Sequence, residues 1–166
     1  IQYIPGHGVH DADIFVTGTG DVFLFMSEDR NVSSSRIESH LYRLDIPGVP
    51  QEGEQEIDLA EVDLPDGAST TRHAEHEHPE RKCAPLFTLL DSIPTDGAHG
   101  AELFRFAGRL WLAVANFGDR HADRVDADST LWVFDEETQR LVRSARVQTR
   151  GATDWEFFRH AGEAYL

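Results

Sequence analysis

The sequence predicts an all-β chain built from β-propeller blades, and three observations support this fold class. Short apolar runs rich in aromatic and β-branched residues alternate with Gly, Pro, Asp and Ser, a pattern typical of strands and turns. No window keeps an apolar period of about 3.6 residues over three turns, as an amphipathic helix would. A motif also recurs along the chain at a spacing close to the length of a four-stranded propeller blade, about 50 residues.

The recurring motif contains an apolar residue, a glycine, a small apolar residue, His or Thr, and then an acid before an apolar pair. Its copies occupy residues 4–15, 93–104 and 147–158. Later glycines follow the three motif glycines by 12, 11 and 11 residues, and an apolar run follows each of them. Because several separate patches keep the same register, the repeat indicates a common structural unit.

Each unit is expected to form a small antiparallel sheet. First strands are predicted at 13–16, 102–106 and 156–160, and each leads through a glycine hairpin into an apolar second strand. The continuous apolar run at 110–115 indicates a second strand buried on both faces. Third strands carry Tyr42 and Trp132, and residues 141–148 are expected to form an outer strand.

These elements predict a first blade at 1–45, a second at 86–140 and the start of a third, cut short, at 141–166. The segment 46–85 is predicted to be an acidic insertion with one short strand near 57–64, or alternatively a degenerate blade. Residues 51–80 within it contain ten acids and one base. Three units are too few to close a propeller, so we expect the sequence to belong to a longer polypeptide.

The charge and composition of the chain limit its partners. The formal net charge is −15, so the surface repels phosphate, and neither nucleic acid nor an anionic membrane is an expected partner. The longest apolar stretch, 110–115, is far shorter than the roughly 18 residues that a membrane span needs, so no direct membrane insertion is expected.

Residues 93–104, 110–116 and 151–158 resemble the epilepsy-associated repeat, also called the EAR or EPTP repeat. This family includes the secreted leucine-rich glioma-inactivated proteins and some adhesion receptors, and the resemblance covers residues 1–45 and 86–166. It implies a seven-bladed propeller that is extracellular or at the cell surface, and that binds proteins without catalysis. Two features depart from the family pattern: Gly100 replaces the acid found as Asp11 in the first copy, and the acidic insertion is unusual.

Five acids of the repeat lie where the innermost strand of each blade is expected to begin: Asp11, Asp13, Glu102, Asp154 and Glu156. Clustered carboxylates suit a hard cation, so these residues are the candidate ligands for Ca²⁺. In the alternative that we favour, each acid accepts hydrogen bonds from neighbouring backbone or from His10, His99 or Thr153, and joins one blade to the next. We therefore predict no cofactor, with Ca²⁺ as the open alternative.

Two further clusters contain residue types that bind metals. The first, His73, His76, His78 and Cys83, follows no established zinc spacing, so a solvated loop is expected. The second, Asp119, Asp123, Asp126 and Asp128, lacks the glycine and terminal Glu of an EF-hand and is expected to be an exposed loop.

Asn31-Val32-Ser33 is an N-glycosylation acceptor and is predicted to lie in a loop between two strands. No phosphate-binding loop, nucleophile elbow or recognisable Ser/His/Asp set occurs in the sequence, so no catalytic residue is predicted. The expected function is a non-catalytic extracellular protein-binding module. The alternative is a structural subunit of a larger extracellular assembly.

Overall fold

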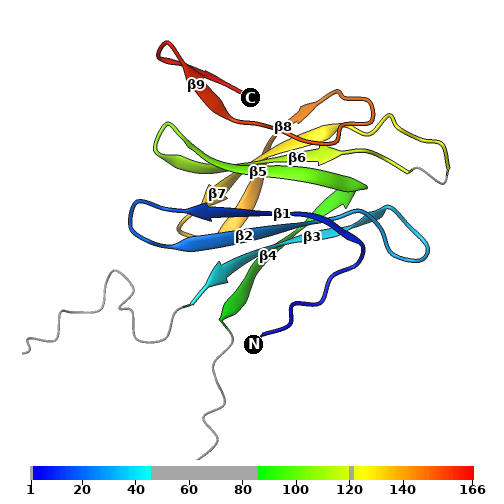
Figure 1. The fold of residues 1–166 in the computed structure, drawn as a ribbon, viewed down its shortest axis with the longest axis horizontal. Coiled ribbons are helices and arrows are strands. Elements are labelled where there is room, and N and C mark those ends of the chain that lie inside the picture. The colour runs from blue at the N-terminus through cyan, green and yellow to red at the C-terminus, as the bar shows by residue number, and fades with distance from the viewer. Residues whose placement is uncertain (1, 46–85, 120–121) are drawn as a thin grey trace, which may run out of the picture.

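A computed structural model describes residues 2–45, 86–119 and 122–166 (Figure 1). These residues form two four-stranded antiparallel sheets and a two-stranded hairpin. The first sheet has the order β1 (Val9–Val16), β2 (Val22–Glu28), β3 (Arg36–Leu44) and β4 (Phe87–Asp96). The second has the order β5 (Ala98–Phe106), β6 (Arg109–Asn116), β7 (Ser129–Asp135) and β8 (Arg140–Val147), and the hairpin pairs β9 (Phe158–His160) with β10 (Glu163–Tyr165).

Each strand of the two sheets pairs with its neighbour along the chain, which is the topology of a propeller blade. The predicted all-β fold class with blade-like sheets is therefore confirmed. In the part of the chain that the structure describes, no helix is long or apolar enough to cross a membrane. The total number of blades stays a prediction.

The sheet boundaries differ from the expected blade boundaries. β4 pairs with β3 from Arg36↔Asp96 to Leu44↔Phe87, so residues 87–96 complete the first sheet instead of opening the second. The outer strand expected at 141–148 is present as β8, which completes the second sheet, so the third unit does not begin at 141. The recurring motif includes both the end of an outer strand and the start of the next inner strand, so the motif does not mark the edge of a sheet.

The segment 46–85 lies outside the described residues, and so do its predicted short strand, the degenerate-blade alternative and the His73–His76–His78–Cys83 cluster. The strands on either side of this segment, β3 and β4, are hydrogen-bonded neighbours in the first sheet.

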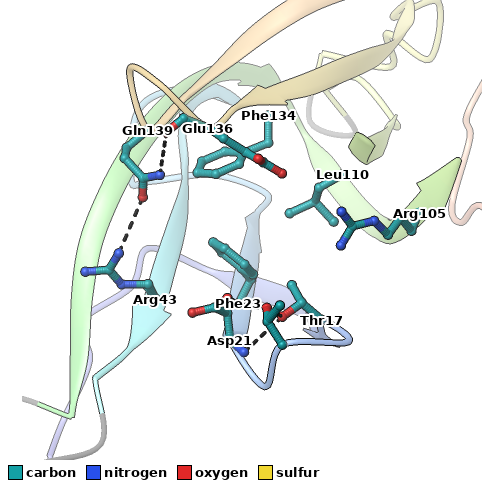
Figure 2. Close-up of a pocket in the computed structure, with 10 residues that line it drawn as sticks. Thr17, Asp21, Phe23, Arg43, Arg105, Leu110, Phe134, Glu136 and Gln139 are labelled. Carbon is teal, nitrogen blue, oxygen red and sulfur yellow. Dashed lines mark hydrogen bonds between the residues drawn. The ribbon is translucent and has the colours of Figure 1, made fainter. Parts of the chain in front are cut away.

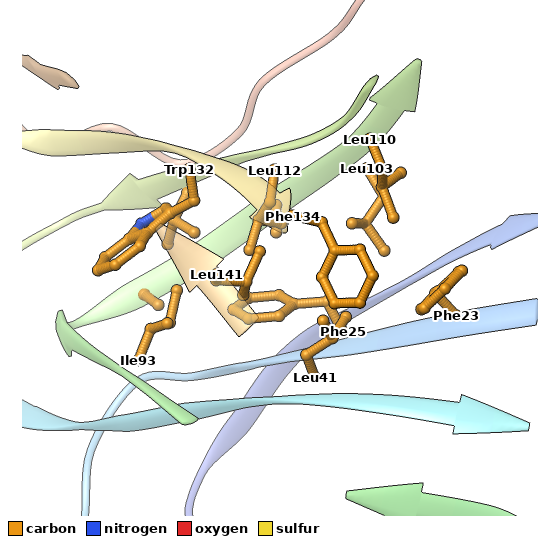
Figure 3. Packing of buried hydrophobic residues seen from close by; sticks show 13 residues of the cluster. Phe23, Phe25, Leu41, Ile93, Leu103, Leu110, Leu112, Trp132, Phe134 and Leu141 are labelled. Carbon is orange, nitrogen blue, oxygen red and sulfur yellow. The ribbon is translucent and has the colours of Figure 1, made fainter. Parts of the chain in front are cut away.

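The two sheets pack face to face around an apolar core (Figure 3). Phe25 and Leu41 from the first sheet and Leu112 from the second are fully buried, with 0% exposure. The rings of Phe23 and Phe134 meet edge to face across the two sheets, with centroids 5.3 Å apart. Burial of these large side chains is the main favourable contribution to the packing of the sheets.

The opposite face of each sheet is also apolar. On the first sheet, Leu24, Met26 and Tyr42 form a second buried cluster with Ile4 and Phe87. On the second sheet, Phe104 stacks on Phe157 of the third repeat, with ring centroids 4.4 Å apart. The second strands are therefore apolar on both faces because each sheet packs on both sides, as the continuous run at 110–115 predicts.

Candidate functional site

The repeat acids join the innermost strand of one unit to that of the next. In β1, Asp13 Oδ2 accepts a hydrogen bond from the backbone N–H of Leu103 at 2.5 Å, and Asp11 Oδ2 accepts one from Ala101 at 3.2 Å. Alternate residues of a strand point to the same side, so this pair of acids faces β5 together. Acceptance by a carboxylate makes these bonds stronger than neutral ones.

The same arrangement recurs between the second and third units. Glu102 of β5 accepts a hydrogen bond at Oε1 from the backbone N–H of Phe157, at 3.3 Å. Asp154 and Glu156 are exposed, and Asp154 Oδ1 accepts a bond from its own neighbour, Trp155. For Asp11, Asp13 and Glu102 the donors across units are backbone N–H groups, which the structural alternative named together with His10, His99 and Thr153.

The histidines of the motif occupy the same place in two units. A β-bulge shifts the register at His10 in β1 and at His99 in β5, and the two imidazole rings stack on each other with centroids 3.8 Å apart. The bulges place equivalent residues of successive units one above the other.

Close contact between units also explains the departure at Gly100. A Cβ atom at this position would lie 2.5 Å from the carbonyl oxygen of Thr153 and 2.7 Å from Asp154 Oδ1. Real Cβ atoms do not approach other atoms so closely, so the acid seen as Asp11 in the first copy has no room here. Glycine at position 100 allows the third unit to pack on the second.

The charges of neighbouring repeat acids act on Asp13 and Glu102. Burial raises the pKa of Asp13, and the charges of Asp11 and Asp154 raise it further. Burial also raises the pKa of Glu102, together with the charges of Asp13, Glu156 and Asp154. The structure therefore brings these acids into one row, and backbone donors compensate part of their charge. Among the described residues, no group of three or more His, Cys, Asp or Glu is arranged to hold a metal ion.

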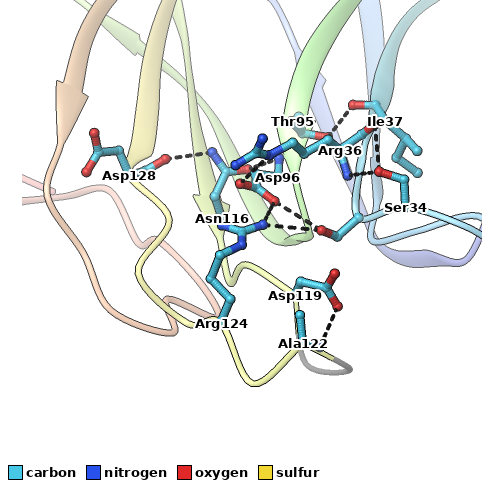
Figure 4. Close-up of polar contacts among 11 residues, drawn as sticks. Ser34, Arg36, Ile37, Thr95, Asp96, Asn116, Asp119, Ala122, Arg124 and Asp128 are labelled. Carbon is cyan, nitrogen blue, oxygen red and sulfur yellow. Dashed lines mark hydrogen bonds and ion pairs between the residues drawn. The ribbon is translucent and has the colours of Figure 1, made fainter.

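A polar cluster ties together the loops at one end of the sheets (Figure 4). Asp96 Oδ1, at the end of β4, accepts hydrogen bonds from Arg124 Nη2 at 2.6 Å and from Ser35 Oγ at 3.1 Å, and Oδ2 lies 3.4 Å from Arg36 Nε. Burial alone would raise the pKa of Asp96, but the hydrogen bonds from Arg124 and Ser35 and the two arginine charges lower it below its usual value. Asn116 also joins the cluster, because its Oδ1 accepts a hydrogen bond from the backbone N–H of Asp96. We call this end, where the β2–β3 and β6–β7 loops meet, the loop end.

The loop that contains the four aspartates, of which residues 120–121 are not described, is held by its own backbone. Asp119 and Arg124 exchange backbone hydrogen bonds of 2.6 and 2.8 Å, and Asp119 Oδ1 accepts one from the N–H of Ala122. The carbonyl oxygen of Asp128 accepts a bond from Asn116 Nδ2.

At the opposite end, where the β1–β2, β5–β6 and β7–β8 turns meet, a cavity of about 300 Å³ opens between the two sheets (Figure 2). We call it the hairpin-end cleft. Phe23, Leu110 and Phe134 form its apolar floor. Its rim is polar and consists of Thr17, Thr19, Asp21, Arg43, Arg105, Glu136 and Gln139.

The polar rim of the hairpin-end cleft is partly ordered by hydrogen bonds. Thr19 Oγ1 donates to Asp21 Oδ2 at 2.8 Å, and the N–H of Asp21 donates to Thr17 Oγ1 at 2.9 Å. Arg43 Nη1 crosses between the sheets to Gln139 Oε1 at 3.5 Å. An apolar floor with a charged rim is the usual composition of a protein-binding surface.

Sequence reasoning did not predict the hairpin-end cleft. Its lining comes from four separate turns and strand ends, and no local spacing links Asp21 to Arg105 or Glu136.

The predicted glycosylation acceptor, Asn31, is exposed in the β2–β3 loop at the loop end.

Comparison with known proteins gives a partial match. No family model matches the sequence. The chain is 38% identical over 72 residues to the human (Homo sapiens) thrombospondin-type laminin G domain and EAR repeat-containing protein, and 36% identical over 72 residues to the mouse (Mus musculus) protein. Each match covers 43% of this chain and 10% of the length of the relative.

Proposed function

The chain belongs to the EAR-repeat family, and from this premise we propose that it is a non-catalytic extracellular module that binds another protein. The hairpin-end cleft is the observation that carries this proposal. It combines three buried or nearly buried apolar side chains with both signs of charge at its rim. Such a surface suits a partner that inserts one apolar side chain and forms charged contacts around it.

The size of the hairpin-end cleft supports a side-chain anchor. Its volume, about 300 Å³, is at the lower limit of ligand pockets, which measure roughly 300–1,000 Å³. Phe23 and Phe134 already pack on each other, so the floor is rigid and little reorganisation is needed for binding. The rim charges of Asp21, Arg43, Arg105 and Glu136 set the orientation and the rate of association more than the affinity.

The proposal is tested by binding of the labelled full-length protein to intact cells. We expect saturable binding that is lost when cell-surface proteins are digested. Arg105→Glu reverses a rim charge and is expected to weaken binding about tenfold. Arg109→Glu, on the same β5–β6 hairpin but outside the cleft lining, is the matched control and is expected to bind as the unaltered protein does. Equal binding by both variants would contradict the role of the cleft.

The alternative of a structural subunit rests on a second surface. An apolar groove of about 220 Å³ lies between the second sheet and the β9–β10 hairpin, with Phe106, Trp111, Leu131 and Tyr165 in its lining. A further β-unit docking there would produce assembly in place of receptor binding. Light scattering over a range of concentrations distinguishes the two: a binding module keeps a constant mass, whereas an assembly subunit grows with concentration.

A further inference from the structure

We propose that Asn31 carries an N-linked glycan, and that this glycan covers the loop end and leaves the hairpin-end cleft as the surface for the partner. The inference rests on the proposed function for one point only, which is that the chain passes through an oxidising, glycosylating compartment. The rest is argued from the geometry of the β2–β3 loop.

The side chain of Asn31 takes part in the β2–β3 turn through its amide oxygen alone. Its Oδ1 accepts hydrogen bonds from the N–H of Ser33 at 2.9 Å, from Ser33 Oγ at 3.1 Å and from the N–H of Ser34 at 2.9 Å. Within the described residues, no hydrogen bond uses Nδ2, the atom that bonds to the sugar. The turn therefore uses the amide oxygen of Asn31 and takes nothing from the amide nitrogen.

The covalent step joins Asn31 to an oligosaccharide carried on a polyprenyl diphosphate. Nδ2 forms a bond to the anomeric carbon of the first sugar and loses one proton. The bond between that carbon and the diphosphate oxygen breaks, and the polyprenyl diphosphate leaves with the electron pair. No oxidant or reductant is needed. A hydroxyl at Ser33 is the feature of the acceptor motif that this chemistry requires.

The loop leaves room for a sugar chain. Asn31 is exposed and its neighbour Val32 has a relative exposure of 107%. The other asparagine of the sequence, Asn116, gives the contrast: it is 3% exposed, and its Oδ1 and Nδ2 both form hydrogen bonds inside the polar cluster. Asn116 also lacks a hydroxyl residue two positions later, where Gly118 stands.

A hollow of about 510 Å³ lies beside Asn31, lined by residues 30–35 of the β2–β3 loop and by Asp119 of the β6–β7 loop. Its lining includes Ser33 and Ser34, whose hydroxyls can form hydrogen bonds with the hydroxyl groups of the first sugars. The loop beneath is fixed to the second sheet by Arg124, which reaches both Ser35 and Asp96. A glycan here would lie across both loops.

The β2–β3 loop, which contains Asn31, and the β1–β2 turn, which lines the hairpin-end cleft, lie at opposite ends of β2 (Figure 1). β2 runs from Val22, next to the cleft, to Glu28, at the start of the β2–β3 loop, and has 7 residues. At about 3.3 Å per residue, this separation is roughly 20 Å. A glycan on Asn31 therefore leaves the cleft open while it hinders proteins that approach the loop end.

The direct test uses the natural protein isolated from its source. Trypsin cleaves after Arg30 and Arg36 and so releases the acceptor as peptide 31–36. The intact protein is therefore treated with peptide N-glycosidase in heavy-oxygen water before trypsin is added, because the enzyme does not act on a glycosylated asparagine at a peptide N-terminus. This treatment is expected to convert Asn31 to an oxygen-18-labelled aspartate in most copies of the peptide. Recovery of the peptide only in its unmodified form would overturn the inference.

Variants of the full-length chain, expressed in its own cells, provide the second test. Ser33→Ala and Asn31→Gln are expected to remove the glycan, whereas Ser33→Thr keeps the acceptor and is the matched control. Ser33→Ala retains both backbone hydrogen bonds to Asn31 Oδ1, so it leaves the turn in place. A glycan that persists on Ser33→Ala would contradict the assignment.

The cell-binding assay separates this inference from the proposed function. We expect the unglycosylated Ser33→Ala protein to bind cells within about twofold of the unaltered protein, since surface changes away from a binding site have small effects. Loss of binding in Ser33→Ala, with normal thermal stability, would show that the loop end contacts the partner. A secreted protein that binds cells but has an unmodified peptide 31–36 would refute the glycan and leave the proposed function standing.

Discussion

Removal of the Asp13 carboxylate tests whether the repeat acids hold the units together. Asp13 is half-buried in β1, and its Oδ2 receives the N–H of Leu103 from the next sheet. Asp13→Ala leaves this buried N–H without its acceptor, whereas Asp13→Asn keeps an acceptor oxygen and removes the charge. The two variants therefore separate the contribution of the hydrogen bond from that of the charge.

The expected magnitude follows from two opposing effects. An unsatisfied buried N–H costs about 1–3 kcal/mol. The charge itself opposes folding, because burial and the neighbouring Asp11 and Asp154 raise the pKa of Asp13. For Asp13→Ala we expect a net loss of about 1–2 kcal/mol, or about 2–8 °C in Tm. Asp13→Asn is expected to lie within about 1 kcal/mol of the unaltered protein, because a new hydrogen bond replaces the lost one.

The pH dependence gives a second signature. Since the pKa of Asp13 is raised in the folded state, protonation stabilises the fold: this contribution is complete below the usual value of 3.8 and is lost as the pH rises through the folded-state pKa. The unaltered protein is therefore expected to gain stability relative to Asp13→Asn as the pH falls through this range.

Urea unfolding at pH 7 and at several acidic pH values measures both signatures. Equal stability of Asp13→Ala and the unaltered protein would refute the role of the hydrogen bond. A gap between the unaltered protein and Asp13→Asn that stays constant with pH would refute the raised pKa.

Three other predictions concern the second carboxylate cluster, the core and metal binding. Asp96→Asn is expected to destabilise the protein at neutral pH, and the difference should disappear as the pH falls through the lowered pKa of Asp96. The stabilisation requires the ionised carboxylate, so it is complete above the usual value of 3.8 and is lost as the pH falls through the folded-state pKa. Urea midpoints that differ equally at all pH values would contradict this. Leu112→Ala removes a fully buried side chain between the sheets and should cost about 2–5 kcal/mol by chemical denaturation, whereas Val142→Ala, at an exposed position of β8, should have a much smaller effect. Added Ca²⁺ is expected to leave Tm unchanged, because carboxylate oxygens of Asp11, Asp13 and Glu102 already accept hydrogen bonds from backbone N–H groups. A rise in Tm with Ca²⁺ that is absent in Asp13→Asn would favour the calcium alternative.

Much of the local structure could be predicted from the sequence. The apolar runs at 22–24 and 110–112 lie in β2 and β6, and Tyr42 and Trp132 lie in β3 and β7 as expected. These elements depend on patterns within a few residues, namely apolar runs, β-branched and aromatic residues, and glycine turns. The predicted first strands were shorter than the observed β1 and β5, because pairing continues past the bulges at His10 and His99 as far as Val9 and Ala98.

The candidate sites were predictable only in part. The periodic acids were recognisable as a repeated feature, but their partners were not, since the Asp13 hydrogen bond joins residues 90 positions apart. Nothing in the sequence around Asp96 indicates that Arg124 will pair with it, because the contact depends on how two loops meet. The hairpin-end cleft is likewise produced by the meeting of separate turns from both sheets.

The sequence by itself determined that this chain forms β-strands in repeated units, because strand formation follows from local apolar patterning and turn residues, and the repeat fixes their order. Only the tertiary structure decided which sheet each outer strand joins. β4 returns to β3 after the segment 46–85, and this pairing depends on backbone hydrogen bonds between strands that are distant in sequence. The cleft and the acid contacts have the same cause: they exist only where two sheets pack, and packing of distant surfaces leaves no local signature in the sequence.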